Sequence, residues 1–171
     1  TDAADIAQLF AAKYKDVYTS VPCNRRDMQA VVDNMNIALR GSSITSDCVF
    51  NIHDIQQAIS RLKSHKSDGC SSLTSEHFIF ADESLLVHIG FLFTSIVVHG
   101  NMPDSFLLST CIPIPKGHNT NLCDSSNFRG IALSSLFGKI FDLIILQWYN
   151  HILTTSELQF GFKAKYSTTM C

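Results

Sequence analysis

The chain has 171 residues, of which 46% are hydrophobic and 16% are charged. This composition supplies enough apolar material for the core of one domain and excludes a disordered polypeptide. The formal net charge of -2 at pH 7 excludes a strongly basic, free-standing nucleic-acid binder, but it leaves room for a local basic site on a piece of a larger protein.

Two amphipathic helices are expected before residue 50. In the first, apolar residues recur at helical spacing from Ile6 to Tyr18, and Asp2 and Asp5 near its start suit the helix dipole. A turn around Pro22 leads to the second helix, whose apolar residues share one face. These residues are Met28, Val31, Val32, Met35 and Leu39. We expect both helices to pack on neighbouring elements.

Two further helices are expected after the Ser-rich linker at residues 41–46. Asn51 can cap the third helix, with Asp54 three residues later. Its apolar stripe consists of Ile52, Ile55, Ala58, Ile59 and Leu62. The helix is expected to end in a cluster of cations, Arg61, Lys63 and Lys66, before the turn formers Asp68 and Gly69.

Asp82 and Glu83 open the fourth helix, whose broad apolar face reaches Val97 and which Gly100 and Pro103 close. The segments FLLSTCIPIPKG and FRGIAL then flank a loop rich in turn formers, which predicts a hairpin at about residues 108–133. Pro113 lacks a backbone N–H, as does Pro115, so their strand is expected at an edge.

Ser134 or Ser135 can cap a fifth helix after the hairpin. Its expected buried side consists of Phe137, Ile140, Phe141, Ile144, Trp148 and Ile152. The pattern therefore predicts an α+β, helix-rich chain with one long-loop β-hairpin packed among about five helices. No domain boundary is visible at Cys171, so we expect the chain to be a fragment.

Neither secretion nor a membrane span is expected. The N-terminus begins TDAADIAQLF, without an initiator Met or a basic segment. The longest apolar run, 85–98, is shorter than the roughly 18 residues that a span needs and is interrupted by His88 and Thr94. These features predict an intracellular protein, in the cytoplasm or the nucleus, that has no membrane partner.

No metal site is predicted within the chain. The six cysteines form no CxxC pair, and the seven histidines form no HxxxH or HExxH pattern. Cys111, His118 and Cys123 lie near the predicted hairpin, but without paired ligand spacing they are interpreted as ordinary core and loop residues. The phosphate-binding pattern GxxxxGK[ST], the dinucleotide pattern GxGxxG and the hydrolase pattern GxSxG do not occur either.

The two cations at the roots of the hairpin loop carry the main functional hypothesis. Lys116 ends the first strand segment and Arg129 begins the second, so a hairpin would place them side by side. A lysine is a compact point charge and an arginine a planar fork of donors, so together they suit a triphosphate. The spacing alone does not fix the register of this pair.

Four blocks of the sequence resemble, in order and spacing, the start of the reverse transcriptase of non-LTR (LINE-type) retrotransposons. The blocks are LKSHKSDGCSSLTSEHF, GNMPDSFLLSTCIPIPKG, NFRGIALSSLFGKIFD and LQFGFKAKYSTT, which together cover about two thirds of the chain. The helices before Asn51 resemble the connector that precedes this domain. Two positions depart from the family pattern: Gly130 stands where many relatives have proline, and residues 66–69 replace a longer turn that contains proline.

The resemblance implies a right-handed polymerase of which residues 1–50 are a helical N-terminal connector and residues 51–171 are the fingers and the beginning of the palm. It implies that Lys116 and Arg129 bind the dNTP. It further implies contacts with the template or primer, for which the matching residues are Lys63, Lys66, Gly69, Gln159, Gly161 and Phe162. The implied partners are an RNA template, a DNA primer, the dNTP and the rest of the palm and thumb.

The resemblance also implies that the catalytic aspartates lie beyond this chain. No [FY]xDD pattern occurs before Cys171, and two-metal phosphoryl transfer needs carboxylates that hold Mg²⁺. Mg²⁺ is therefore expected in the complete parent enzyme, and this fragment alone is predicted to be inactive. The alternatives are a non-catalytic retroelement remnant, an RNA-binding or structural domain that retains the fold, and an RNA-templated polymerase of another lineage such as an intron-encoded maturase.

Overall fold

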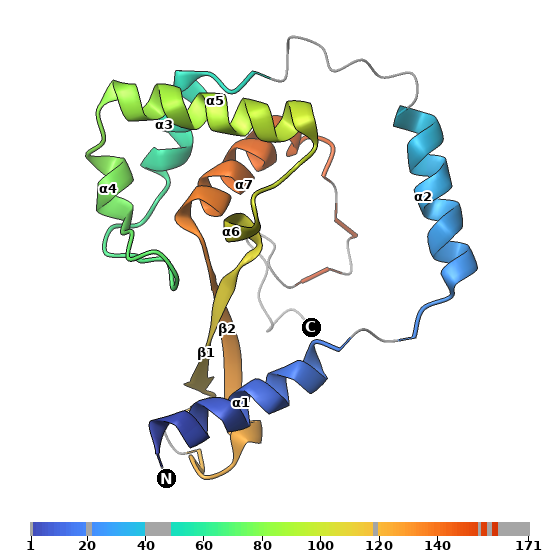
Figure 1. Ribbon diagram of the computed structural model, residues 1–171, viewed down its shortest axis with the longest axis vertical. Coiled ribbons are helices and arrows are strands. Elements are labelled where there is room, and N and C mark those ends of the chain that lie inside the picture. The colour runs from blue at the N-terminus through green and yellow to red at the C-terminus, as the bar shows by residue number, and fades with distance from the viewer. Residues whose placement is uncertain are drawn as a thin grey trace.

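The computed structural model describes residues 2–19, 22–39, 49–117, 120–153, 155–156 and 159–160. Most of its helices pack into a body from which a two-stranded hairpin projects (Figure 1). The helices are α1 (Ala3–Val17), α2 (Arg25–Leu39), α3 (Ile52–Ser60), α4 (Ser75–Ile79), α5 (Glu83–His99), α6 (Asp104–Leu107) and α7 (Leu136–Tyr149). The strands are β1 (Ser109–Pro115) and β2 (Phe128–Ser134), and a short 3-10 helix, Ser125–Asn127, precedes β2.

The body is built from α3 to α7. Helix α3 packs on both α5 and α7, because each presents apolar residues one turn apart to the same core. Fully buried at this junction are Ile55, Ile89, Phe93, Ile140 and Ile144. Gly90 lets α5 approach the chain closely, since a Cβ there would lie 2.8 Å from the carbonyl oxygen of Phe50.

Aromatic rings fill the centre of the body. Phe50 stands at the middle of the group, with ring centroids 4.6 Å from Trp148 and 5.5 Å from Phe93. The indole N–H of Trp148 donates to a carboxylate oxygen of Asp54 at 3.2 Å, so the polar end of this half-buried ring has a partner.

The predicted helix starts are confirmed. The side chains of Asn51, Asp82 and Ser135 accept hydrogen bonds from the backbone N–H groups of Asp54, Leu85 and Gly138. Gly100 ends α5 in the left-handed conformation, at φ 62, where glycine avoids the strain that a Cβ would cause.

Three details differ from the sequence-based expectation. Helix α3 ends at Ser60, so Lys63 and Lys66 lie in the following loop and not on the helix. Helix α7 ends at Tyr149, which leaves Ile152 in a turn and 61% exposed. The short helices α4 and α6 were not predicted, because their runs of five and four residues are too short to show helical periodicity.

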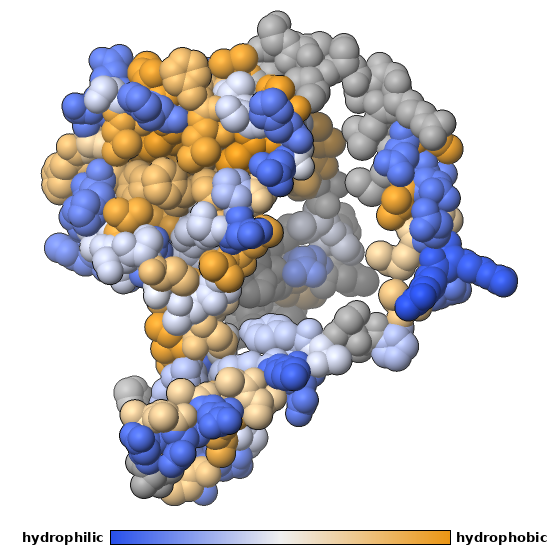
Figure 2. All heavy atoms as spheres, viewed as in Figure 1, coloured by the Kyte–Doolittle hydropathy of each residue, from blue (hydrophilic) through white to orange (hydrophobic). Residues whose placement is uncertain are grey.

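Helix α2 stands apart from the body and the hairpin (Figure 1). Its apolar residues Met28, Val31 and Val32 are exposed, so the expected packing of this helix is absent among the residues that the structure describes. Figure 2 shows the contrast: hydrophobic side chains cover much of the body, whereas α2 presents mainly hydrophilic ones. The expected linker at 41–46 lies outside the described residues.

Candidate functional site

The hairpin has a fixed register that places its two cations. β1 and β2 are antiparallel, with Ile112 opposite Ile131 and Ile114 opposite Arg129. Beyond the last strand pair, the backbone N–H of Lys116 donates to the carbonyl oxygen of Asn127 at 2.8 Å. The pairing predicted for about 108–133 is therefore confirmed, with Lys116 opposite Asn127.

Lys116 and Arg129 lie on the same face of the hairpin. Side chains alternate between the two faces of a strand, and Lys116 is two residues from Ile114, the partner of Arg129. The two cations are thus diagonal neighbours, and such positions lie about 7–8 Å apart in an antiparallel pair. Both side chains are exposed, and in the described part of the chain neither forms an ion pair with a carboxylate.

The prolines of β1 make its outer edge a poor partner for another strand. Because the N–H of Lys116 points toward β2, the nitrogens of Pro113 and Pro115 point away from it. The outer edge of β1 therefore lacks two donors that another strand would need. This agrees with the predicted edge position.

We call the surface formed by Ile112, Ile114, Lys116, Arg129 and Ile131 the cationic face. The three isoleucines are between 40% and 47% exposed, so an apolar strip leads from the body to the two cations. A lysine and an arginine at this spacing can bind an anion with several charged oxygens, while the strip can contact an apolar or aromatic part of the same ligand.

An acidic residue lies near the cationic face and was missed in the sequence. The carboxylate of Asp124 accepts hydrogen bonds from the hydroxyl and the backbone N–H of Ser126, at 2.7 and 2.8 Å. These bonds, together with the charges of Lys13 and Lys116, lower the pKa of Asp124. The DSS sequence is a typical turn signal, but only the fold brings Asp124 near Lys116.

The loop between α3 and α4 reaches the base of the cationic face. The hydroxyl of Thr110 in β1 donates to the carbonyl oxygen of Gly69 at 3.1 Å, and the thiol of Cys70 lies 3.2 Å from the same hydroxyl. A Cβ at Gly69 would lie 2.5 Å from that of Thr110, so this contact requires glycine. The structure thus joins Gly69 to the strand that leads to Lys116.

Internal hydrogen bonds hold this loop in shape. The carboxylate of Asp68, which is 6% exposed, accepts from the backbone N–H of Ser71 at 2.8 Å. The backbone N–H of His65, a residue in the left-handed region at φ 57, donates to Glu76 at 2.6 Å. This bond is the largest of several hydrogen bonds that together lower the pKa of Glu76 to about 2. Lys66 is carried on this loop, and its side chain is exposed.

The remaining predicted contact residues lie in two other segments of the sequence. Lys63 is exposed just after α3. Gln159 follows α7, where its backbone N–H donates to the carbonyl oxygen of Ser156 at 3.0 Å. Gly161 and Phe162 lie outside the described residues. Their assignment to a template or primer stays a prediction.

Glycine at position 130 has a structural reason. A Cβ at this position would lie 2.9 Å from the ring of Tyr14 and 2.9 Å from the sulfur of Cys111. Helix α1 therefore occupies the space that a larger residue would fill. No sequence pattern linked Tyr14 to Gly130.

The described residues do not offer a metal site, since no group of three or more His, Cys, Asp or Glu side chains converges within them. These residues therefore do not provide the cluster of ligands that the Mg²⁺ ions of a polymerase need. The binding of Mg²⁺ by the parent enzyme stays a prediction. His118 of the alternative zinc set lies outside the described residues. Within the same part of the chain, no helix is both long and apolar enough to cross a membrane.

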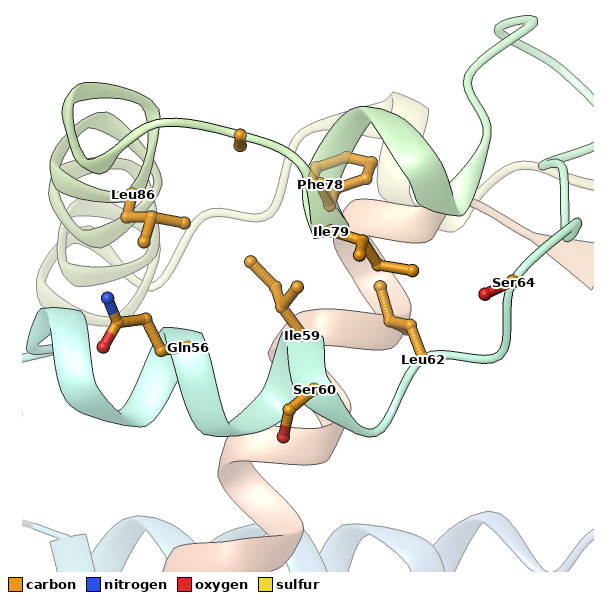
Figure 3. Close-up of a pocket in the computed structure, with 9 residues that line it drawn as sticks. Gln56, Ile59, Ser60, Leu62, Ser64, Phe78, Ile79 and Leu86 are labelled. Carbon is orange, nitrogen blue, oxygen red and sulfur yellow. The ribbon is translucent and has the colours of Figure 1, made fainter.

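A separate hollow lies within the helical body. It has a volume of about 480 Å³, and Figure 3 shows Ile59, Phe78, Ile79 and Leu86 lining it from α3, α4 and α5. Its polar side chains, Gln56, Ser60 and Ser64, carry no charge. The hollow therefore lacks the groups that bind a multiply charged anion.

The comparison with known proteins supports a retrotransposon-derived protein. The chain is 25% identical over 113 residues to a 115 kDa protein in the type-1 retrotransposable element R1DM of Drosophila melanogaster. The match covers 66% of this chain and 11% of that protein, so the chain spans about a tenth of the length of the relative. No family model matches the sequence.

Proposed function

We propose that this chain is the fingers and the first part of the palm of a retrotransposon RNA-directed DNA polymerase. The observation that carries this proposal is the placement of Lys116 and Arg129 as diagonal neighbours on one exposed face of a two-stranded hairpin. The similarity to a retrotransposon protein supports the same origin.

In this proposal the cationic face binds the triphosphate of the incoming dNTP. Lys116 contacts phosphate oxygens as a point charge, and Arg129 contacts them through two parallel N–H donors. The exposed isoleucines lie beside these cations and contact the apolar parts of the nucleotide. The loop that carries Lys66 meets the same hairpin at Thr110, and in this proposal the exposed Lys66 contacts the template backbone.

The chemistry of nucleotide transfer lies outside the described residues. Carboxylates of the parent enzyme would hold Mg²⁺, and Mg²⁺ would supply the positive charge that activates the primer hydroxyl and neutralises the leaving pyrophosphate. The residues of this chain orient the nucleotide and neutralise its charge. We therefore expect no primer extension by the 171-residue chain alone.

A non-catalytic role is the second candidate. It is a remnant that keeps the fold for RNA contact, and the observation that favours it is the exposure of Lys66, Lys116 and Arg129, cations that suit an RNA backbone. Such a remnant needs the exposed cations of the loop and the hairpin, but it needs no nucleotide specificity.

RNA-templated primer extension by the full-length protein that contains this chain separates the two candidates. The proposal predicts incorporation that requires dNTP, Mg²⁺ and an RNA template. RNA binding without any incorporation, in a preparation shown to be folded, would favour the non-catalytic role. The 171-residue chain, assayed in parallel, is the control that is expected to give no product.

A further inference from the structure

Helix α1 contacts the hairpin on the face opposite to the cations. Side chains alternate along β2, so the two neighbours of Arg129, namely Phe128 and Gly130, belong to this opposite face. The ring of Phe10 meets that of Phe128 edge to face, with centroids 5.0 Å apart, and Tyr14 lies against Gly130. α1 thus holds the backbone on both sides of Arg129.

The fit between Tyr14 and Gly130 depends on space and not on backbone conformation. The φ angle of Gly130 is outside the positive range, so any L-residue could adopt this backbone. A Cβ would nevertheless lie 2.9 Å from the Tyr14 ring, a separation that forces one of the two elements to move. Glycine here leaves the space in which the ring sits.

A third contact fastens α1 to the loop end of the hairpin. The ammonium group of Lys13 donates a hydrogen bond to the carbonyl oxygen of Ser125. Ser125 belongs to the 3-10 helix that leads into β2 and directly follows Asp124. Because the donor is charged, this bond is stronger than one between neutral groups.

The hairpin needs such support because an isolated two-stranded hairpin is only marginally stable in water. Phe10 is the residue of α1 that becomes buried, with 9% of its surface exposed, and it does so against β2. A binding group is effective only when its own position is held by neighbouring residues. α1 supplies these neighbours for Arg129.

We propose that α1 is a positioning element for the cationic face: Tyr14, seated on Gly130, holds the backbone of Arg129 in place from the opposite side of the hairpin. This inference rests on the proposed function, because the dNTP triphosphate is the ligand that the positioned cation binds. Tyr14 acts through the hairpin and does not touch the nucleotide.

The test compares Gly130→Ala and Tyr14→Ala with the parent in the full-length protein. Hydrogen exchange of the α1 amides reports docking, and the dNTP dependence of primer extension reports the position of Arg129. Both variants are expected to speed exchange in α1 by at least about tenfold and to raise the KM for dNTP by about three- to tenfold. The affinity for template RNA should stay unchanged.

Two further variants serve as matched controls. Tyr14→Phe keeps the ring and removes a hydroxyl that is buried without a partner among the described residues, so it is expected to retain docking and the parent KM. Lys15→Ala removes an exposed cation of the same helix and is expected to change neither readout.

The outcomes separate this inference from the proposed function. Faster exchange in α1 with an unchanged KM would overturn the positioning role and leave the function standing. Unchanged exchange in Gly130→Ala would show that Tyr14 does not seat on this glycine. If Arg129→Ala itself leaves the KM unchanged, the proposed function fails, while the exchange data still report whether α1 docks.

Discussion

The helical body and the hairpin are stabilised in different ways. In the body, α3, α5 and α7 bury an aromatic and aliphatic core in which Phe93 and Ile140 are 0% exposed. The hairpin has no such core: its strands pair with each other, α1 covers one face, and the cationic face stays exposed. Buried core residues are thus concentrated in the body, and the proposed binding groups lie on the hairpin.

The expected effect of a substitution therefore depends on the region in which it lies. In the body, a lost side chain leaves a cavity and lowers the free energy of unfolding. On the cationic face, the proposed function predicts that a lost side chain removes a contact with the nucleotide and leaves the fold unchanged.

Phe93→Ala should cause the largest loss of stability. Its ring is 0% exposed and packs edge to face against Phe50 and Phe141, so truncation is expected to lower the free energy of unfolding by about 3–5 kcal/mol. Chemical denaturation measures this change. Phe91→Ala, two residues away on the same helix and 69% exposed, is the control and should change stability by less than about 0.5 kcal/mol. Equal losses in the two variants would contradict the assignment of the core.

Gly90→Ala should cause a smaller loss in the same region. The added Cβ would lie 2.8 Å from the carbonyl oxygen of Phe50, so α5 must shift, at an expected cost of about 1–3 kcal/mol. Gly117→Ala is the matched control, because its nearest neighbour lies at an ordinary 3.7 Å. Denaturation of both variants checks this contrast, and a Gly90→Ala protein as stable as the parent would contradict the close packing of α5.

Glu76→Gln should make the free energy of unfolding less dependent on pH in the acidic range. In the folded state, hydrogen bonds to the carboxylate, of which that from the His65 N–H is the largest cause, lower the pKa of Glu76 from 4.5 to about 2. A carboxyl group with a lowered pKa contributes stability above its ordinary pKa and loses it as the pH falls to the folded value.

The stability difference between the parent and Glu76→Gln should therefore be present at pH 6 and disappear between about pH 4.5 and about pH 2. Denaturation at a series of pH values measures it. Asp16, an exposed acidic residue of α1, provides the control variant Asp16→Asn. A difference that stays constant over this range would show that Glu76 does not hold the loop through its charge.

Local signals in the sequence predicted much of the fold. Asn51, Asp82 and Gly100 marked helix ends because capping and the left-handed conformation depend on short-range chemistry. The apolar spacing of α5 and α7 identified most of the buried side chains for the same reason. The end of α3 at Ser60 could not be predicted from the sequence, because Leu62 continues the apolar stripe beyond the helix and is still buried in the core.

The candidate site was only partly predictable. The two prolines of β1 and the turn-rich loop identified the hairpin, so Lys116 and Arg129 could be paired in advance. The contacts of Gly69 with Thr110 and of Tyr14 with Gly130 join segments that are far apart in the sequence. No local pattern reports such contacts, since they depend on how the chain returns to the hairpin.

The dNTP dependence of primer extension by Arg129→Ala, in the full-length protein, tests the cationic face most directly. Loss of a charge-assisted contact is expected to remove about 1.5–3 kcal/mol of binding, so the KM for dNTP should rise by roughly ten- to a hundredfold, with unchanged template affinity and unchanged stability. Lys116→Ala should behave similarly, and Lys15→Ala should match the parent. An unchanged dNTP dependence in both Arg129→Ala and Lys116→Ala would contradict the account.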